Sequence, residues 1–254
     1  MKSLPAIVTP SLISSIRRHP YLPRNTWYFI AATTLSILNR PDEIPKVYQH
    51  ALENGGDYFD VAPSEDEQRK ISRRIREALI KSSAVSGVPR TINALLELKK
   101  VTPPHLLDEP GGCSPSGRTY DIHDISINVI LDRGQSFFNK IYGKISRRVM
   151  GQMDSSGTED LGLLARLTYG YVLSNTKVLS AVETSYLLIA GLIPQDVNPQ
   201  LKGHLRGAIN GGATVEEVRA VRNVVIEICE ASGMKMLDES VPAGWGWRSE
   251  VATV

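Results

Sequence analysis

The chain has 254 residues, 42% of them hydrophobic, which is enough to bury a sizeable core in one large domain or in two fused small ones. Its net charge of +2 is too small for the concentrated basic face that nucleic-acid binding requires, and no stretch of 18 apolar residues predicts a membrane span. The two cysteines, Cys113 and Cys229, lie far apart, so composition argues against a nucleic-acid partner, a membrane partner and a disulfide framework.

The segment before Asp42 contains no acidic residue, and it carries Lys2, Arg17, Arg18 and Arg24 among several serines. A mitochondrial presequence has this composition, but the prolines at positions 5, 10, 20 and 23 would break a long amphipathic helix there. We therefore expect a cytoplasmic protein, which the sparse cysteines also favour, and keep a mitochondrial location as the alternative.

Helical periodicity dominates the rest of the chain, and alternating segments typical of strands are few, so the pattern predicts an all-α protein. A basic run at 69–81 follows an acidic helix start, which is typical of a solvated or salt-bridged helix face. We expect helices near residues 26–39, 42–54, 65–86, 89–100, 124–152, 158–173, 180–193, 199–210 and 215–232.

Residues 102–122 contain four prolines and three glycines, a concentration of helix breakers that predicts a linker. This linker divides the chain into a first helical lobe at 1–101 and a second at 123–254.

The two lobes resemble each other. Residues 46–56 align without gaps on 202–212, sharing a lysine, an asparagine and a pair of glycines, and each segment follows an apolar helix that contains an aromatic residue. The matched order of elements favours an internal duplication over a chance match. Tyr48 then occupies the place in the first lobe that His204 occupies in the second, which makes it a candidate substrate contact.

The segment from Asn198 onward has readable helix boundaries. Asn198 is a good N-cap, Pro199 suits the first helical position, and Gly211 or Gly212 can end the helix. A second helix begins at Thr214, which forms a capping box with the glutamate three residues later.

The first of these helices has two faces of different character. His204 shares a face with Leu201 and Ala208, whereas Arg206 and Asn210 lie on the other side, since residues three and four apart are neighbours on a helix. A histidine on an apolar face is typical of a hydrogen-bonded core residue, so from spacing alone a structural role remains the alternative to a functional one.

The same helix resembles the carboxymuconolactone decarboxylase and alkylhydroperoxidase D-like (AhpD-like) superfamily. Its members carry a helix of the form H-x-x-G-A-x-N-x-G-A-T-x-E-E, and residues 76–95 are similar to the helix, Gly-x-Pro turn and helix of the same superfamily. The resemblance implies an AhpD-like helical fold, most similar to two-lobed fungal members, and a site role for the histidine. The motif is matched by His204, Gly207, Ala208, Asn210, Gly212, Ala213, Thr214, Glu216 and Glu217.

The chain departs from the superfamily at its other site positions. Val197 and Gln200 stand where peroxidase members carry cysteines, so a thiol-peroxidase mechanism is excluded. The glutamate that superfamily members carry on the preceding helix falls near Ser185 or Tyr186, and the closest acid is Glu183, which also fits a capping box with Ser180. Tyr186 is a candidate donor to an oxyanion, with a place at the edge of the pocket as the alternative.

The remaining candidates are contacts to substrate. Arg206 and Asn210 offer polar groups, and Tyr169 belongs to an aromatic stripe that is typical of a core or of a pocket wall. Nucleotide-binding motifs are absent and the five histidines show no metal-ligand spacing, so we expect neither a cofactor nor a metal.

Together these features predict a cofactor-independent lyase or isomerase, similar to the decarboxylase branch, that acts on a small organic acid, a lactone or a polyketide-type carbonyl compound. His204 is the expected general acid or base, with Tyr186 and Glu183 as the other catalytic candidates. The alternative is a non-catalytic ligand-binding or scaffold protein, and an antioxidant role could rest only on Cys229. The resemblance also implies a homo-oligomer.

Overall fold

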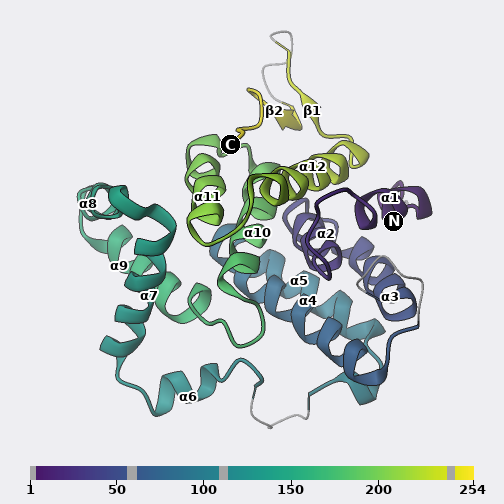
Figure 1. The fold of residues 1–254 in the computed structure, drawn as a ribbon, viewed down its shortest axis with the longest axis horizontal. Coiled ribbons are helices and arrows are strands. Elements are labelled where there is room, and N and C mark those ends of the chain that lie inside the picture. Colours follow the sequence, from purple (N-terminus) through teal and green to yellow (C-terminus); the bar gives the residue numbers. More distant parts are fainter. Residues whose placement is uncertain (1–3, 56–61, 109–113, 239–243) are drawn as a thin grey trace.

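The computed structural model describes residues 4–55, 62–108, 114–238 and 244–254, and it confirms the all-α prediction (Figure 1). The strands in this part of the chain are two-residue segments, β1 (Lys235–Met236) and β2 (Gly246–Trp247), which pair in parallel. Among the described residues, no helix is both long enough and apolar enough to cross a bilayer.

Two helices form the centre of the molecule. Every residue of α2 (Trp27–Ile37) is buried, as are nine of the twelve residues of α10 (Ala181–Leu192), and the two helices pack on each other. A helix that is apolar on all sides is stable only inside a core. They are surrounded by α3 (Ile44–Asn54), α4 (Glu65–Ser86), α5 (Val88–Val101), α11 (Asn198–Asn210) and α12 (Val215–Ala231).

The elements around the two central helices follow the same order. Helix α2 is followed by α3 and α4, which pack back on it, and α10 is followed by α11 and α12, which do the same. Each central helix also contacts a helix of the other set, α2 with α12 and α10 with α4. One hydrophobic cluster runs through both sets, so the predicted lobes share a core. The duplication and the division at 102–122 stay predictions.

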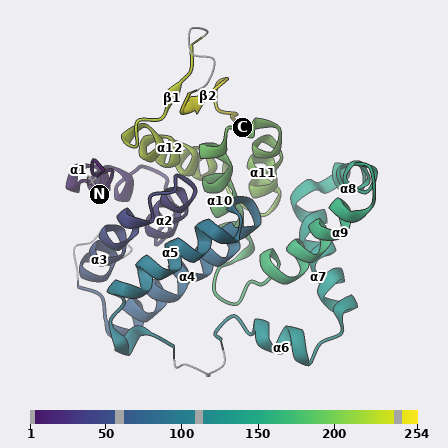
Figure 2. The same cartoon turned by 180° about the vertical axis from the view of Figure 1, so that it is seen from behind.

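A separate group of helices lies on the far side of the central helices from α1 (Pro10–Arg17) and α3, as Figures 1 and 2 show. We call this group the arm. The arm consists of α6 (Arg118–His123), α7 (Ile127–Tyr142), α8 (Ser146–Asp154), α9 (Asp160–Leu167) and a π-helix at Thr168–Leu173.

The predicted linker at 102–122 leads into the arm. Its part at 109–113, which includes Cys113, lies outside the described residues, and the rest contains a short 3-10 turn and the start of the arm.

The arm departs from the predicted helices at glycines. The single helix expected at 124–152 is wrong, because α7 ends at Tyr142 and Gly143 has a φ of 53°. Gly134 and Gly170 let the backbones of α7 and the π-helix touch, since a Cβ on Gly134 would lie 2.4 Å from the Gly170 nitrogen. The helix expected at 158–173 accordingly changes to π geometry in its last six residues.

Candidate functional site

His204 lies on the inner face of α11, as its helical position predicts, and is 5% exposed. Its Nε2 lies 3.4 Å from the hydroxyl of Tyr142, and its Nδ1 is buried with no hydrogen-bond partner in the described part of the chain. Burial lowers the pKa of His204 from 6.5 to about 4. The imidazole is therefore uncharged at neutral pH.

Tyr142 is the last residue of α7, and it connects His204 to a second tyrosine. Its ring meets the imidazole edge-on at 5.8 Å, and its phenol lies close enough to that of Tyr169, in the π-helix, for each to influence the pKa of the other. Burial raises the pKa of both phenols, so both hydroxyls keep their protons. The structure thus joins two of the predicted site residues, His204 and Tyr169, through a third that sequence reasoning did not select.

Glycines on either side of His204 admit Tyr142 to this position. A Cβ on Gly203 would lie 3.1 Å from the Tyr142 ring, and one on Gly207 would lie 2.5 Å from the Ile141 side chain. The end of α7 can therefore rest directly against the backbone of α11. Two glycines four residues apart form a small-residue stripe, which is the sequence signal for such a close approach.

A groove with a volume of about 540 Å³, which Tyr142 helps to line, opens between α7, α8, α11 and the C-terminal residues. Lys202 and Arg206 are exposed in it and form no ion pair with any described residue. Asn210 lines it too and donates a 2.9 Å hydrogen bond to the Ile141 carbonyl. His204 is not among the lining residues, which also include Ile141, Ile145, Val149, Gln152, Pro199, Gln200, Gly203, Leu205, Thr253 and Val254.

Tyr186 and Glu183 are placed in other interactions. The Tyr186 hydroxyl donates a 3.1 Å hydrogen bond to Glu217, the glutamate that caps α12 together with Thr214. Burial and the charge of Glu217 raise the pKa of Tyr186. Both predicted capping boxes, Thr214 with Glu217 and Ser180 with Glu183, are confirmed.

Glu183 also forms an ion pair with Arg74 of α4. Burial raises the pKa of this carboxyl, but the hydrogen bond and charge of Arg74 outweigh burial and hold the pKa below its ordinary value. The same guanidinium donates to the Tyr28 hydroxyl at 2.8 Å and lies 5.2 Å from the ring centre of Phe29. Glu183 therefore fastens α10 to the first half of the chain.

The remaining predicted residues lie apart from the groove. Tyr48 is fully buried, and its hydroxyl is 2.6 Å from that of Ser72 in α4. Asn198 was expected to cap α11, but it starts the helix without capping it, and its side chain instead accepts a hydrogen bond from Ala252. Cys229 is buried and burial raises its pKa, which disfavours the thiolate that an antioxidant role needs.

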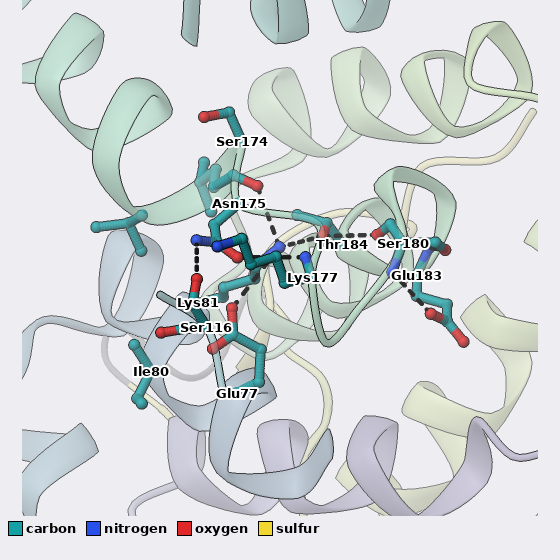
Figure 3. A network of polar contacts seen from close by, with 12 residues as sticks. Glu77, Ile80, Lys81, Ser116, Ser174, Asn175, Lys177, Ser180, Glu183 and Thr184 are labelled. Atoms are coloured by element: carbon teal, nitrogen blue, oxygen red, sulfur yellow. Dashed lines mark hydrogen bonds and ion pairs between the residues drawn. The ribbon is translucent and has the colours of Figure 1, made fainter. Parts of the chain in front are cut away.

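Lys81 forms a buried polar cluster that the sequence did not predict (Figure 3). Its Nζ donates to Thr184 at 2.6 Å and to the Leu173 carbonyl at 3.1 Å, and it lies 3.9 Å from Glu77. Glu77 in turn forms a double ion pair with Arg118 of the arm. Of the solvated or salt-bridged face expected for residues 69–81, Arg74 and Lys81 are ion-paired but buried, because they lie in line with Ile71 and Ala78.

The Lys81 cluster is a junction and not an open site. Burial lowers the pKa of Lys81 to about 7, so part of the population carries a neutral amine at neutral pH. The side chain is fully buried, and its protons are directed at groups of α10, α4 and the end of the π-helix. Its contacts join the arm to the core. Among the described residues, no cluster of three or more histidines, cysteines or carboxylates could hold a metal ion.

Comparison with known proteins finds two yeast relatives, each named peroxisomal protein 2. The protein from Schizosaccharomyces pombe is 41% identical over 208 residues, covering 82% of this chain and 87% of the relative. The protein from Saccharomyces cerevisiae is 35% identical over 268 aligned positions, covering 88% of this chain and 94% of the relative. No family model and no solved structure matches the chain. The names of both relatives point to the peroxisome and contradict both the cytoplasmic location expected from the sequence and its mitochondrial alternative.

Proposed function

Because this chain belongs to the family of peroxisomal protein 2, we propose that it works in the peroxisome and that the site beside α11 is that of a cofactor-independent lyase or isomerase. We place it in the carboxymuconolactone decarboxylase and AhpD-like superfamily on the strength of the motif around His204. The observation that carries the proposed chemistry is the position of Tyr142, which both lines the groove and meets His204.

The groove fits an organic acid. Lys202 and Arg206 supply positive charge that no described carboxylate neutralises, which suits the carboxylate of a ligand. Ile141, Ile145 and Val149 supply an apolar wall for its carbon skeleton. The substrate class is therefore a small or medium organic acid, or a lactone or polyketide-type carbonyl compound that carries an acidic group.

Tyr142 supplies the proton that the reaction needs. When the bond to the carboxylate breaks, CO2 leaves and its electron pair forms an enolate on the neighbouring carbonyl group, which requires a hydrogen bond and then a proton on carbon. The Tyr142 phenol provides both and becomes a phenolate, which regains its proton from solvent in the groove, while the uncharged His204 orients the Tyr142 hydroxyl through Nε2.

This proposal is tested by loss of substrate and release of CO2 in a panel of 3-oxo acids and acidic lactones. Tyr142→Phe is expected to lower kcat by about 10²–10⁴-fold, the usual value of a positioned acid. Arg206→Ala is expected to raise KM with little change in kcat, whereas Arg219→Ala, an exposed arginine outside the groove, changes neither. Full turnover in both Tyr142→Phe and His204→Gln would refute the assignment.

A second candidate function is binding without turnover. It is favoured by the burial of His204, by the place of Glu183 in a helix cap and by the hydrogen bond of Tyr186 to Glu217, which leave Tyr142 as the proposed catalytic candidate that lines the groove. Native mass spectrometry with the same acids distinguishes the two functions, since a binding protein retains the acid unchanged and loses it in Arg206→Ala. In either case we expect a small-molecule ligand and a homo-oligomer.

A further inference from the structure

Helix α9 presents an unusual number of apolar side chains to solvent. Four of its eight residues are exposed leucines, although the helix packs on α7, α8 and the π-helix. Scattered exposed apolar residues are ordinary on protein surfaces, but a contiguous group indicates an interaction site. These residues are Leu161, Leu163, Leu164 and Leu167, which we call the leucine ridge.

An apolar groove adjoins the ridge. It has a volume of about 470 Å³ and is formed by α6, the start of α7 and the π-helix. Ile122 and Ile127 line it and are themselves more than half exposed. Leu167 lines it as well, so the ridge and the groove are one continuous surface.

This surface requires a partner without charge. The charged side chain in the groove lining is Asp121, and it is buried in an ion pair with Arg133 at 2.7 Å. A stable interface needs about 800 Å² on each partner with an apolar centre, and six large side chains that are about half exposed, set around a groove, supply such a centre. The chain carries both an apolar ridge and an apolar groove, and a twofold dimer buries both by pairing the ridge of each copy with the groove of the other.

We propose that a second copy of this chain covers the surface, with the leucine ridge of each copy seated in the apolar groove of the other. This gives the proposed homo-oligomer a defined face on the arm. It does not depend on the proposed chemistry, because it is tested by molecular mass and not by turnover.

The test is light scattering of the full chain after size-exclusion chromatography. We expect wild type to have the mass of two 27.9 kDa chains and Leu164→Asp to be monomeric, with at least 100-fold weaker association. The matched control is Leu96→Asp in α5, where the leucine is 54% exposed compared with 61% for Leu164, and this variant stays dimeric. Circular dichroism checks that each variant is folded.

A charge pair tests how the two copies fit. Ile122→Lys in the groove is expected to be monomeric by itself. When it is mixed with Leu164→Asp, the two variants are expected to associate, because one ridge–groove contact then pairs Asp with Lys and the other contains only wild-type residues. The proposal is wrong if wild type is monomeric, if Leu164→Asp remains dimeric, or if the two variants fail to associate. A monomeric wild type that binds lipid vesicles through Leu164 would assign the surface to a membrane instead.

Discussion

The same helix position differs in the two halves of the molecule. In α11, His204 stands between Gly203 and Gly207, and the end of α7 lies against those glycines. In α3 the aligned residue is Tyr48, between Val47 and Ala51, which are both buried in the core. The histidine meets a tyrosine that opens on a groove, whereas Tyr48 meets a buried serine of α4.

The difference shows that the helical frame alone does not make a site. Both halves place an aromatic or imidazole side chain on the inner face of the helix after a central buried helix. What distinguishes the second half is the pair Gly203 and Gly207. These glycines let α7 of the arm pack closely on α11, which puts Tyr142 beside His204 and in the wall of the groove. The following predictions test this contrast.

The largest expected effect is a dependence of stability on pH that comes from His204. Its pKa is about 4 in the folded chain and about 6.5 when unfolded, so between these values the unfolded state binds a proton that the folded state does not. The contribution of His204 to the free energy of unfolding is fully present above pH 6.5. It is lost as the pH falls towards 4, by about 3 kcal/mol in total. Urea unfolding of wild type and His204→Gln at both pH values measures it.

In that comparison, wild type should lose about 3 kcal/mol more than His204→Gln between the two pH values. Gln is chosen because its amide can still bond to the Tyr142 hydroxyl. Equal losses in the two proteins would mean that the imidazole is not sealed in the folded state.

A somewhat smaller effect is expected from filling the glycine stripe. Gly207→Ala places a Cβ 2.5 Å from the Ile141 side chain, so α7 must move, at a cost of about 1–3 kcal/mol. Gly151→Ala in α8 is the matched control, because a Cβ there meets nothing within 4 Å and the helix gains about 0.5–1 kcal/mol. Chemical denaturation measures the free energy of unfolding, which should fall in Gly207→Ala and rise in Gly151→Ala. An unchanged free energy of unfolding in Gly207→Ala would contradict the close packing of α7 on α11.

Much of the frame follows from local sequence. The all-α class, both capping boxes and the opposite faces of His204 and Arg206 depend on residues within one or two turns of each other, so they could be predicted. The cytoplasmic location was wrong because a basic, proline-rich lead segment does not identify a compartment.

The site itself depends on contacts between distant segments. Tyr142 and His204 are 62 residues apart, and a tyrosine in an aromatic stripe is typical of a core, so periodicity gave no reason to select it. Lys81 was missed for the same reason, since its partners Thr184 and Leu173 lie about a hundred residues away. Periodicity predicts which face a side chain takes, but not which element crosses that face.

The smallest effect separates the two halves most directly, because the same substitution is made in each. Tyr48→Phe removes one buried hydrogen bond to Ser72, whose hydroxyl still donates to the Gln68 carbonyl at 2.8 Å, so stability should fall by about 1 kcal/mol with unchanged turnover. Tyr142→Phe should cost no more stability, but it abolishes the proton donor in the groove. Melting curves and turnover of the two variants measured side by side decide the point, since loss of turnover in Tyr48→Phe would place chemistry in the first half as well.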